Sequence, residues 1–504
     1  MRKVRLAAAV AAALFGSSLA VGPTFAQSFD GPAAAPAVAS GSAATSEADL
    51  AYRQRNFRGA IEAASRGIEA DPNDHAAYYL RGSARVEEGL QTSNPELVRA
   101  GVGDARESIR LEGSGKPDYY LPYIYGMTML SRMDSNVEFA RTASAVVEQV
   151  QQRAALTPAE EANLRYQQAM AELAVTEISA QKAGRKPQAG EYGGVVAALG
   201  KAIQNKPRHL AARMLLADIY VRAERHDDAA TAFAQAIEIS DNSPIPYNNR
   251  GMYRRSRGDF AGAMDDFAKA LEVDPTFYQA ATNRGFALMQ AERPTEAIAA
   301  FDASLRINPQ QPGAVSLRAA TRLSSGDLSR AIADYQEALR LDPSNAMASA
   351  DLGFASFFAG QYAAAARAFS QAQQAGGANM AFLDPWRYYA YELAGLRREA
   401  AGVLGPIDAK RQQGADALGW PDLLALYLSG RISGQSLVDS VNKEDEGVRT
   451  MQLTEAYYFI GLRSLKEGDA GAARPYLERA ATSRATNLSA QRGAKIALRS
   501  LPMR

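Results

Sequence analysis

The side chains that most often carry out chemistry in proteins are scarce in this sequence. Histidine occurs only at His75, His209 and His226, and cysteine does not occur at all. No histidine has a second one four residues away, as the zinc-binding H-E-x-x-H pattern requires. Without cysteine there is no thiol nucleophile, thiolate ligand or disulfide. We therefore predict no metal site and interpret the three histidines as ordinary turn or surface residues.

Two short motifs resemble known catalytic patterns but lack essential members. Residues 113–117 read Gly-Ser-Gly-Lys-Pro, yet a phosphate-binding loop needs Ser or Thr after Lys116 and a glycine where Arg110 stands. The S-x-x-K pattern occurs at 179–182 and 440–443, but no K-T-G motif accompanies it. We predict no catalytic residue, no cofactor and no enzymatic activity.

A function must then rest on a surface, and an internal repeat of 34 residues indicates which elements build it. Five units in register extend from residue 210 to residue 379. Small residues form one column, at Ala229, Ala263, Ala297, Ala331 and Ala365, and aromatic residues form another, at Phe233, Phe267, Phe301, Tyr335 and Phe369. Earlier in each unit a further small column contains Ala217, Gly251, Gly285, Ala319 and Gly353.

These columns predict pairs of antiparallel helices. Two helices of about 13 residues with tight turns account for one period. Small residues let the paired helices approach closely, and the aromatic residue fills the space beside that contact. Gly258-Asp259 and Gly326-Asp327 supply a turn followed by a helix N-cap. Proline at 275, 309 and 343 ends the second helix.

The repeat resembles the tetratricopeptide repeat (TPR) family, which has the same period. The resemblance implies an all-α fold, a TPR α-solenoid in which antiparallel helix pairs form a right-handed superhelix. We expect degenerate TPR units at 50–117, irregular helical hairpins at 118–209, five regular repeats at 210–379, a helical hairpin region at 380–429, a linker at 430–453, and a C-terminal TPR with a capping helix at 454–504. Thr157 and Glu160 predict a capping box that opens a helix in the irregular region. Pro475 predicts a kink or a late helix start in the last unit.

The N-terminus has the features of an export signal. Arg2, Lys3 and Arg5 precede an apolar run that ends at Phe15, and small residues lead to Ala26. We predict a signal peptide at 1–26 and a disordered Ala/Pro/Ser linker at 27–49. An uncleaved membrane anchor is the alternative, although the run is short and broken at Gly16. No later segment has the roughly 18 apolar residues of a membrane span.

Charge and composition then suggest a location. Removing the signal takes three of 56 cations, which leaves 53 against 55 acids and a net charge of about −2. This balance provides no field for nucleic acid or for an anionic membrane surface. We expect a soluble periplasmic protein of a Gram-negative bacterium, and not a lipoprotein, because cysteine is missing.

In the TPR family the first helix of each unit lines the binding groove, and this resemblance assigns the candidate contact residues. They combine amides with soft or aromatic side chains, which suits an extended peptide. The predicted groove residues are Asn248, Asn249, Met252, Asn283, Phe286, Met289, Phe354 and Phe357, with Arg255 and Phe358 on the same stripes. The alternative is that Met and Phe pack against neighbouring helices.

Charged positions of the repeat allow two further expectations. Asn249 and Asn283 match an asparagine that some TPR domains use to bind a C-terminal carboxylate, but the lysine positions hold residues such as Gln279 and Thr282. Arg250, Arg284 and Arg318 recur beside the small column. We interpret their regularity as structural, with packed stems and solvated heads.

The C-terminal part, from Trp420 to Ala481, resembles NlpI-type envelope TPR proteins in its Trp-Pro pair and its Tyr-rich last repeat. That resemblance implies an adaptor. We therefore expect a non-catalytic periplasmic scaffold that binds proteins or peptides. A cell-wall glycan binder or enzyme using region 118–206 is the alternative, with Tyr119, Tyr120, Tyr123 and Tyr125 available for sugar stacking. Self-assembly through the end repeats is a third possibility.

Overall fold

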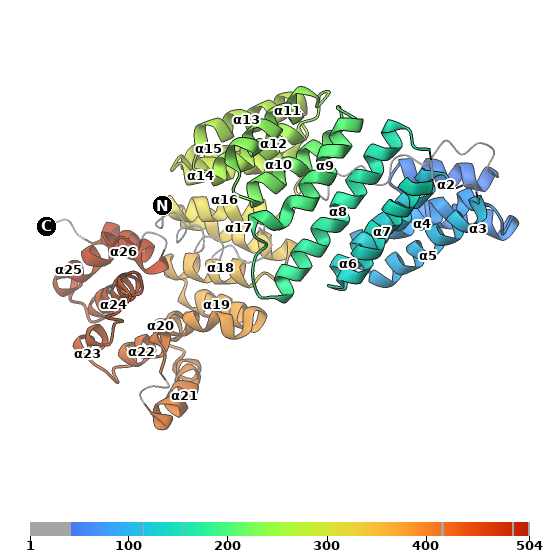
Figure 1. Ribbon diagram of the computed structural model, residues 1–504. Helices are drawn as coiled ribbons and strands as arrows, with labels where there is room; N and C mark the ends of the chain where they lie inside the picture. The colour runs from blue at the N-terminus through green and yellow to red at the C-terminus, as the bar shows by residue number, and fades with distance from the viewer. Residues whose placement is uncertain (1–41, 114, 154, 415–417, 486–487, 502–504) are drawn as a thin grey trace. The chain divides into compact units, whose positions relative to one another are not determined.

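The computed structural model describes residues 42–501, except residues 114, 154, 415–417 and 486–487. The predicted signal peptide and the first part of the predicted linker lie outside the described residues. Within the described part the chain contains helices and turns but no strand, so the predicted all-α class is confirmed (Figure 1). No helix in this part is both long enough and apolar enough to cross a membrane.

The chain divides into two compact units between Tyr253 and Arg254, within helix α12 (Ile245–Ser256). In the first unit, consecutive helices pack against one another. Its helices before α12 are α2 (Ala43–Arg53), α3 (Phe57–Ala70), α4 (His75–Gln91), α5 (Pro95–Glu112), η2 (Pro117–Tyr120), α6 (Leu121–Met133), α7 (Val137–Arg153), α8 (Pro158–Lys182), η3 (Ala189–Tyr192), α9 (Gly193–Asn205), α10 (Leu210–Arg222) and α11 (His226–Glu238).

The second unit contains the remaining regular repeats and the C-terminal hairpins. Each helix from α13 to α19 packs on the next, which is the stacking that the repeat predicts. Its helices are α13 (Phe260–Val273), α14 (Tyr278–Gln290), α15 (Pro294–Ile307), α16 (Pro312–Ser324), α17 (Leu328–Leu341), α18 (Ala346–Phe358), α19 (Tyr362–Gly376), η4 (Gly377–Leu383), α20 (Asp384–Leu393), α21 (Arg397–Gln413), α22 (Trp420–Leu428), α23 (Gly434–Asp439), α24 (Glu446–Lys466), α25 (Ala470–Ala481) and α26 (Ser489–Ser500).

The aromatic column packs directly on the early small column. A methyl group added to Gly285 would lie 2.7 Å from the ring of Phe301, and one added to Gly353 would lie 2.4 Å from the ring of Phe369. Both rings are fully buried. The glycines are therefore small because the next helix places an aromatic ring against their backbone, as predicted.

The turns between paired helices need a left-handed residue. Gly258 and Gly326 have φ values of +82° and +85°, and the following Asp259 accepts a hydrogen bond from the backbone N–H of Gly262 at 2.9 Å. The predicted glycine turn and N-cap are confirmed there. One repeat later than Gly258 the same position is Glu292, with φ +58°.

Two predicted linker boundaries are wrong. Helix α2 begins at Ala43, within the predicted linker 27–49, because its small residues pack closely: Ala48 is fully buried, and Thr45 donates a hydrogen bond to Asp74 at 2.6 Å. The predicted linker 430–453 contains α23 and the start of α24. Leu437 is fully buried there, and Asp445 caps α24 by accepting from the N–H of Val448 at 2.9 Å.

Two local predictions at helix starts have different outcomes. The capping box is confirmed, since Thr157 accepts from the N–H of Glu160 and its own N–H donates to the Glu160 carboxylate at 2.8 Å. Helix α25, in contrast, starts at Ala470 and continues through Pro475. The predicted late start is wrong because Asp469 caps the helix, accepting from the N–H of Ala472 at 2.8 Å.

Candidate functional site

The predicted groove face is best preserved on helix α14 of the second unit. Asn283, Phe286 and Met289 occur every third residue, which keeps them on one face of the helix, and all three are partly exposed. Phe286 and Met289 also border a small core cluster that contains Leu288 and Phe301. These side chains are therefore anchored at one edge and accessible at the other.

The last turn of α12 adds a cation to this face. The guanidinium of Arg255 lies over the ring of Phe286, 4.2 Å from its centroid. Its Nη1 donates a long hydrogen bond of 3.5 Å to the Gln290 side-chain oxygen, and its Nε is buried without a partner. Burial lowers the pKa of Arg255 to about 10. The positive charge of Arg255 is thus partly removed from water and lies beside two neutral side chains, Phe286 and Gln290.

The two asparagines that precede this turn lie in a different environment. Asn248 and Asn249 are buried, and the Asn248 amide donates to the Asn249 oxygen at 3.1 Å. The expectation that both side chains face a groove is wrong, because they lie on a buried face of the helix. Met252 on the same helix is partly exposed.

The predicted aromatic contacts on α18 are core residues. Phe354 and Phe357 are 5 % and 4 % exposed. Their rings lie edge-on to Trp386 of α20, at 5.0 and 5.4 Å between centroids. The prediction that Phe354 and Phe357 contact a ligand in the groove is therefore wrong. Both side chains pack against neighbouring helices, and Trp386 fills the space beside them.

Helix α26 also packs against α18. A methyl group on Gly493 would lie 2.7 Å from the Phe358 ring and 2.5 Å from the Tyr458 hydroxyl. Burial raises the pKa of Asp351 to about 6, and the positive charge of Arg492 on α26 opposes that rise. Asp351 occupies the position that Asn283 has two repeats earlier. The chain's own last helix therefore covers part of this face.

Of the three arginines that recur beside the small column, Arg318 forms ion pairs with carboxylates. Arg318 donates two hydrogen bonds to the buried Asp334, at 3.0 and 2.8 Å, and Arg322 donates a third at 2.6 Å. In the first unit Arg81 and Arg85 share Asp104 in the same way. The head of Arg318 is thus paired and not merely solvated, whereas Arg284 is exposed.

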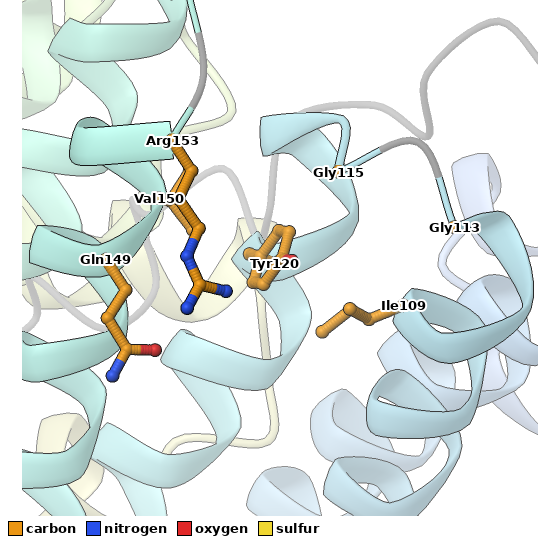
Figure 2. A pocket seen from close by; sticks show the side chains of 7 residues that line it. All are labelled: Ile109, Gly113, Gly115, Tyr120, Gln149, Val150 and Arg153. Atoms are coloured by element: carbon orange, nitrogen blue, oxygen red, sulfur yellow. The ribbon is translucent and has the colours of Figure 1, made fainter.

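The irregular region of the first unit contains a cavity of about 340 Å³ between the ends of α5 and α7. Figure 2 shows Tyr120, Gln149 and Arg153 gathered around it, with Ile109 on the opposite side. Tyr119, which the glycan alternative also included, is buried and packs on the Tyr79 ring at 5.3 Å. Of the four tyrosines that the glycan alternative included, Tyr120 lines this cavity.

A second hollow, of about 390 Å³, lies along α7 and α8. It is lined by Arg141, Glu148, Glu172 and Glu191, among others. Burial raises the pKa of Glu172, and the neighbouring Glu148 adds to the rise. Among the residues that the structure describes, no three His, Asp or Glu side chains form a cluster suited to a metal ion.

The histidines include one buried helix cap. His209 precedes α10, and its Nδ1 accepts from the N–H of Ala212 at 3.3 Å. Burial, with a smaller contribution from Lys206, lowers the pKa of His209 to about 4. His209 lies between a turn and a helix, as the turn interpretation expects, but its ring is buried and does not lie on the surface.

Sequence reasoning placed Arg255 on the stripe but missed its contact with Phe286, and it missed Asp351 altogether. The repeat could have identified Asp351 as a residue of the same stripe, since it aligns with Asn249 and Asn283 at multiples of 34 residues. Helix α26, which packs on α18 and carries Arg492, begins at Ser489 and is not part of the period.

Comparison with protein-family models finds tetratricopeptide repeats at residues 45–108 and 248–312, at 188–247 and at 321–357. The chain therefore contains TPR units, including the degenerate ones near the N-terminus. Parts of this chain are also similar to solved structures. PilF of Pseudomonas aeruginosa matches with 18 % identity, over 44 % of this chain and 96 % of that protein, at a TM-score of 0.36.

Two further structures match over similar lengths. MamA from Desulfovibrio magneticus RS-1 has 20 % identity, with 33 % of this chain and 94 % of that protein covered, at a TM-score of 0.31. YrrB, described as a TPR protein with an unusual peptide-binding site, has 18 % identity, with 37 % of this chain and 95 % of that protein covered, at 0.32.

Proposed function

We propose that this chain is a non-catalytic scaffold of the bacterial periplasm that binds a protein or peptide segment on the first-helix face of its TPR units. The observation that carries the proposal is the set of partly exposed residues on α14, namely Asn283, Phe286 and Met289. Their amide, aromatic and thioether groups stand in one row beside the cation of Arg255.

This row offers complementary contacts for an extended segment. An amide such as that of Asn283 can hydrogen-bond a peptide backbone, and Phe286 and Met289 can cover apolar side chains. The residues are fixed on packed helices, so little conformational entropy is lost on binding. Binding of this kind needs no bond to be made or broken.

The binding test is affinity capture from an envelope extract after crosslinking. The wild-type chain is compared with the variants Asn283→Ala and Met289→Ala, and with the control Lys269→Ala on the exposed side of α13. We expect both groove variants to capture less partner and the control to capture as much as wild type. No captured partner with the wild-type chain would contradict the scaffold proposal.

The proposed location rests on the N-terminal sequence alone. Cell fractionation followed by N-terminal sequencing of the mature protein tests it, with cleavage expected after Ala26. Replacing Arg2, Lys3 and Arg5 by Asp should hold the chain in the cytoplasm. Recovery of uncleaved protein from the cytoplasm of wild-type cells would contradict export.

Glycan binding remains the second candidate function, and the cavity beside Tyr120 favours it. An aromatic face with an amide and a guanidinium is a suitable set for a sugar ring. Purified chain incubated with isolated cell-wall sacculi distinguishes the two functions. Co-sedimentation that Tyr120→Ala abolishes supports glycan binding, and release of soluble fragments would contradict the non-catalytic proposal.

A further inference from the structure

Arginines of the second unit that leave the solvent are normally matched with carboxylates. Arg254 donates to the buried Asp266 at 3.0 Å, and Arg318 and Arg322 share Asp334. A carboxylate is the usual partner because removing a guanidinium from water without a counter-charge is unfavourable.

Arg255, the residue next to Arg254, departs from this rule. Within the described part of the chain it forms no ion pair, and its only hydrogen bond is the long contact with the neutral Gln290 side chain. The ring of Phe286 compensates part of the lost hydration, because an aromatic face attracts a cation. The rest of the hydration that the Arg255 guanidinium loses is not compensated among the residues that the structure describes, and a negatively charged group beside it would compensate for it.

The chain itself provides a template for such a contact. Asp351 on α18 corresponds to Asn283 on α14, and helix α26, which packs on α18, carries the cation Arg492, whose charge acts on Asp351. A segment laid on this face thus contributes the opposite charge. Beside α14 the fixed charge is positive instead, because Arg255 at the end of α12 lies over the Phe286 ring.

We infer that Arg255, held on Phe286, selects an acidic side chain in the protein segment that binds this face. The inference rests on the proposed scaffold function and names the chemistry of its partner. A glutamate or aspartate can accept two hydrogen bonds from one guanidinium, while its neighbours contact Phe286 and Met289.

A side-chain carboxylate fits better than a terminal one or a phosphate. The lysine positions of carboxylate-binding TPR domains hold Gln279 and Thr282 here, and the Thr282 hydroxyl is already bonded to Ser304 at 2.6 Å. One guanidinium matches one negative charge, whereas a phosphate carries up to about two at neutral pH.

An array of short random peptides tests the inference with the full-length chain. Each peptide is made with Glu, Gln, Asp or Asn at every position in turn, and with a free or an amidated C-terminus. We expect the wild type to prefer Glu or Asp over its amide at one position by about tenfold, as for a charge-assisted hydrogen bond. The preference should be the same with both C-termini and should weaken at high salt.

Variants then assign the preference to the residue. Arg255→Gln should bring the Glu-to-Gln ratio close to one while peptides still bind, and Arg255→Lys should retain part of it. Arg284→Gln makes the same charge change at an exposed position of α14 and should keep the wild-type ratio. Circular dichroism confirms that each variant is folded.

The results distinguish a wrong role for Arg255 from a wrong scaffold function. If wild type binds peptides but Arg255→Gln keeps the acidic preference, the assignment of Arg255 is wrong and the scaffold function stands. A preference that vanishes on amidation of the C-terminus also overturns it, in favour of a terminal carboxylate. If wild type binds no peptide and captures no protein, the scaffold function itself fails.

Discussion

At the scale of single residues, the carboxylate of Asp334 is the clearest buried charge with a defined set of partners. It is 7 % exposed at the side chain and accepts from both Arg318 and Arg322. Asp334 is the paired carboxylate of Arg322 and one of two for Arg318, which also pairs with Asp302 at 2.6 Å, so the loss of Asp334 affects more than one interaction. The same arrangement at Asp104 in the first unit shows that the motif recurs.

We expect Asp334→Ala to destabilise the second unit by about 3 kcal/mol, since Arg322 loses its carboxylate partner and Arg318 keeps only Asp302. Urea unfolding followed by circular dichroism measures the midpoint. Glu337→Ala, which breaks an exposed pair with Arg340 on the same helix, serves as control and should leave the midpoint unchanged. Equal shifts for the two variants would contradict the role of the buried pair.

The ionisation of Glu455 should make the stability of the second unit depend on pH. Burial raises its pKa from 4.5 to about 7, although its carboxylate accepts from the Trp420 indole N–H at 2.7 Å. The folded state binds the proton more tightly than the unfolded state, so the contribution to stability is complete below pH 4.5 and is lost as pH rises through about 7. The loss is at most about 3 kcal/mol.

The variant Glu455→Gln keeps an acceptor for Trp420 but cannot ionise. Thermal unfolding between about pH 5 and pH 8 should show a smaller pH dependence for the variant than for wild type. The difference between the two curves isolates Glu455 from the other titrating groups. Parallel curves would show that the raised pKa of Glu455 does not affect stability.

At the scale of helices and turns, much of the fold could be predicted from the sequence because packing acts within one repeat. Gly285 and Phe301 are in contact and only 16 residues apart, so a fixed period retains both partners. The predicted linker boundary at residue 49 is wrong because the packing there depends on another helix. Ala48 and Thr45 appear too small to build a core, but they pack well where another helix approaches closely.

The turn before α15 provides a test of backbone strain. Glu292 adopts φ +58°, where its aligned counterparts Gly258 and Gly326 have no side chain to strain. Glu292→Gly should raise the stability of the second unit by about 1 kcal/mol. Gly258→Ala, at a site where an added methyl group meets nothing within 4 Å, should lower it by a similar amount, measured by thermal unfolding. A lower midpoint for Glu292→Gly would contradict the strain argument.

At the scale of the whole molecule, the candidate site could be predicted only in part. The periodic pattern treats Phe286 and Phe354 as equivalent, since they lie two repeats apart. The structure leaves Phe286 partly exposed but covers Phe354 with Trp386. Trp386 comes from outside the regular repeats, so no periodic argument could place it on α18.

The C-terminal helix extends this difference, because α26 contacts α18 across more than a hundred residues of sequence. Gly493 permits the contact, since its backbone approaches both Phe358 and Tyr458. Long-range packing of this kind stabilises two elements together, so that weakening one exposes the other.

We therefore expect Gly493→Val to detach α26 from α18, because the larger side chain would overlap the two rings. Hydrogen exchange should then become faster in 346–358 as well as in 489–500, while 260–273 on α13 stays protected. Gly402→Ala, at a helical glycine of α21 with open space around it, is the matched control and should leave exchange unchanged. Faster exchange limited to 489–500 would mean that α26 does not support α18, whereas faster exchange in both segments would show that the two helices are stabilised together.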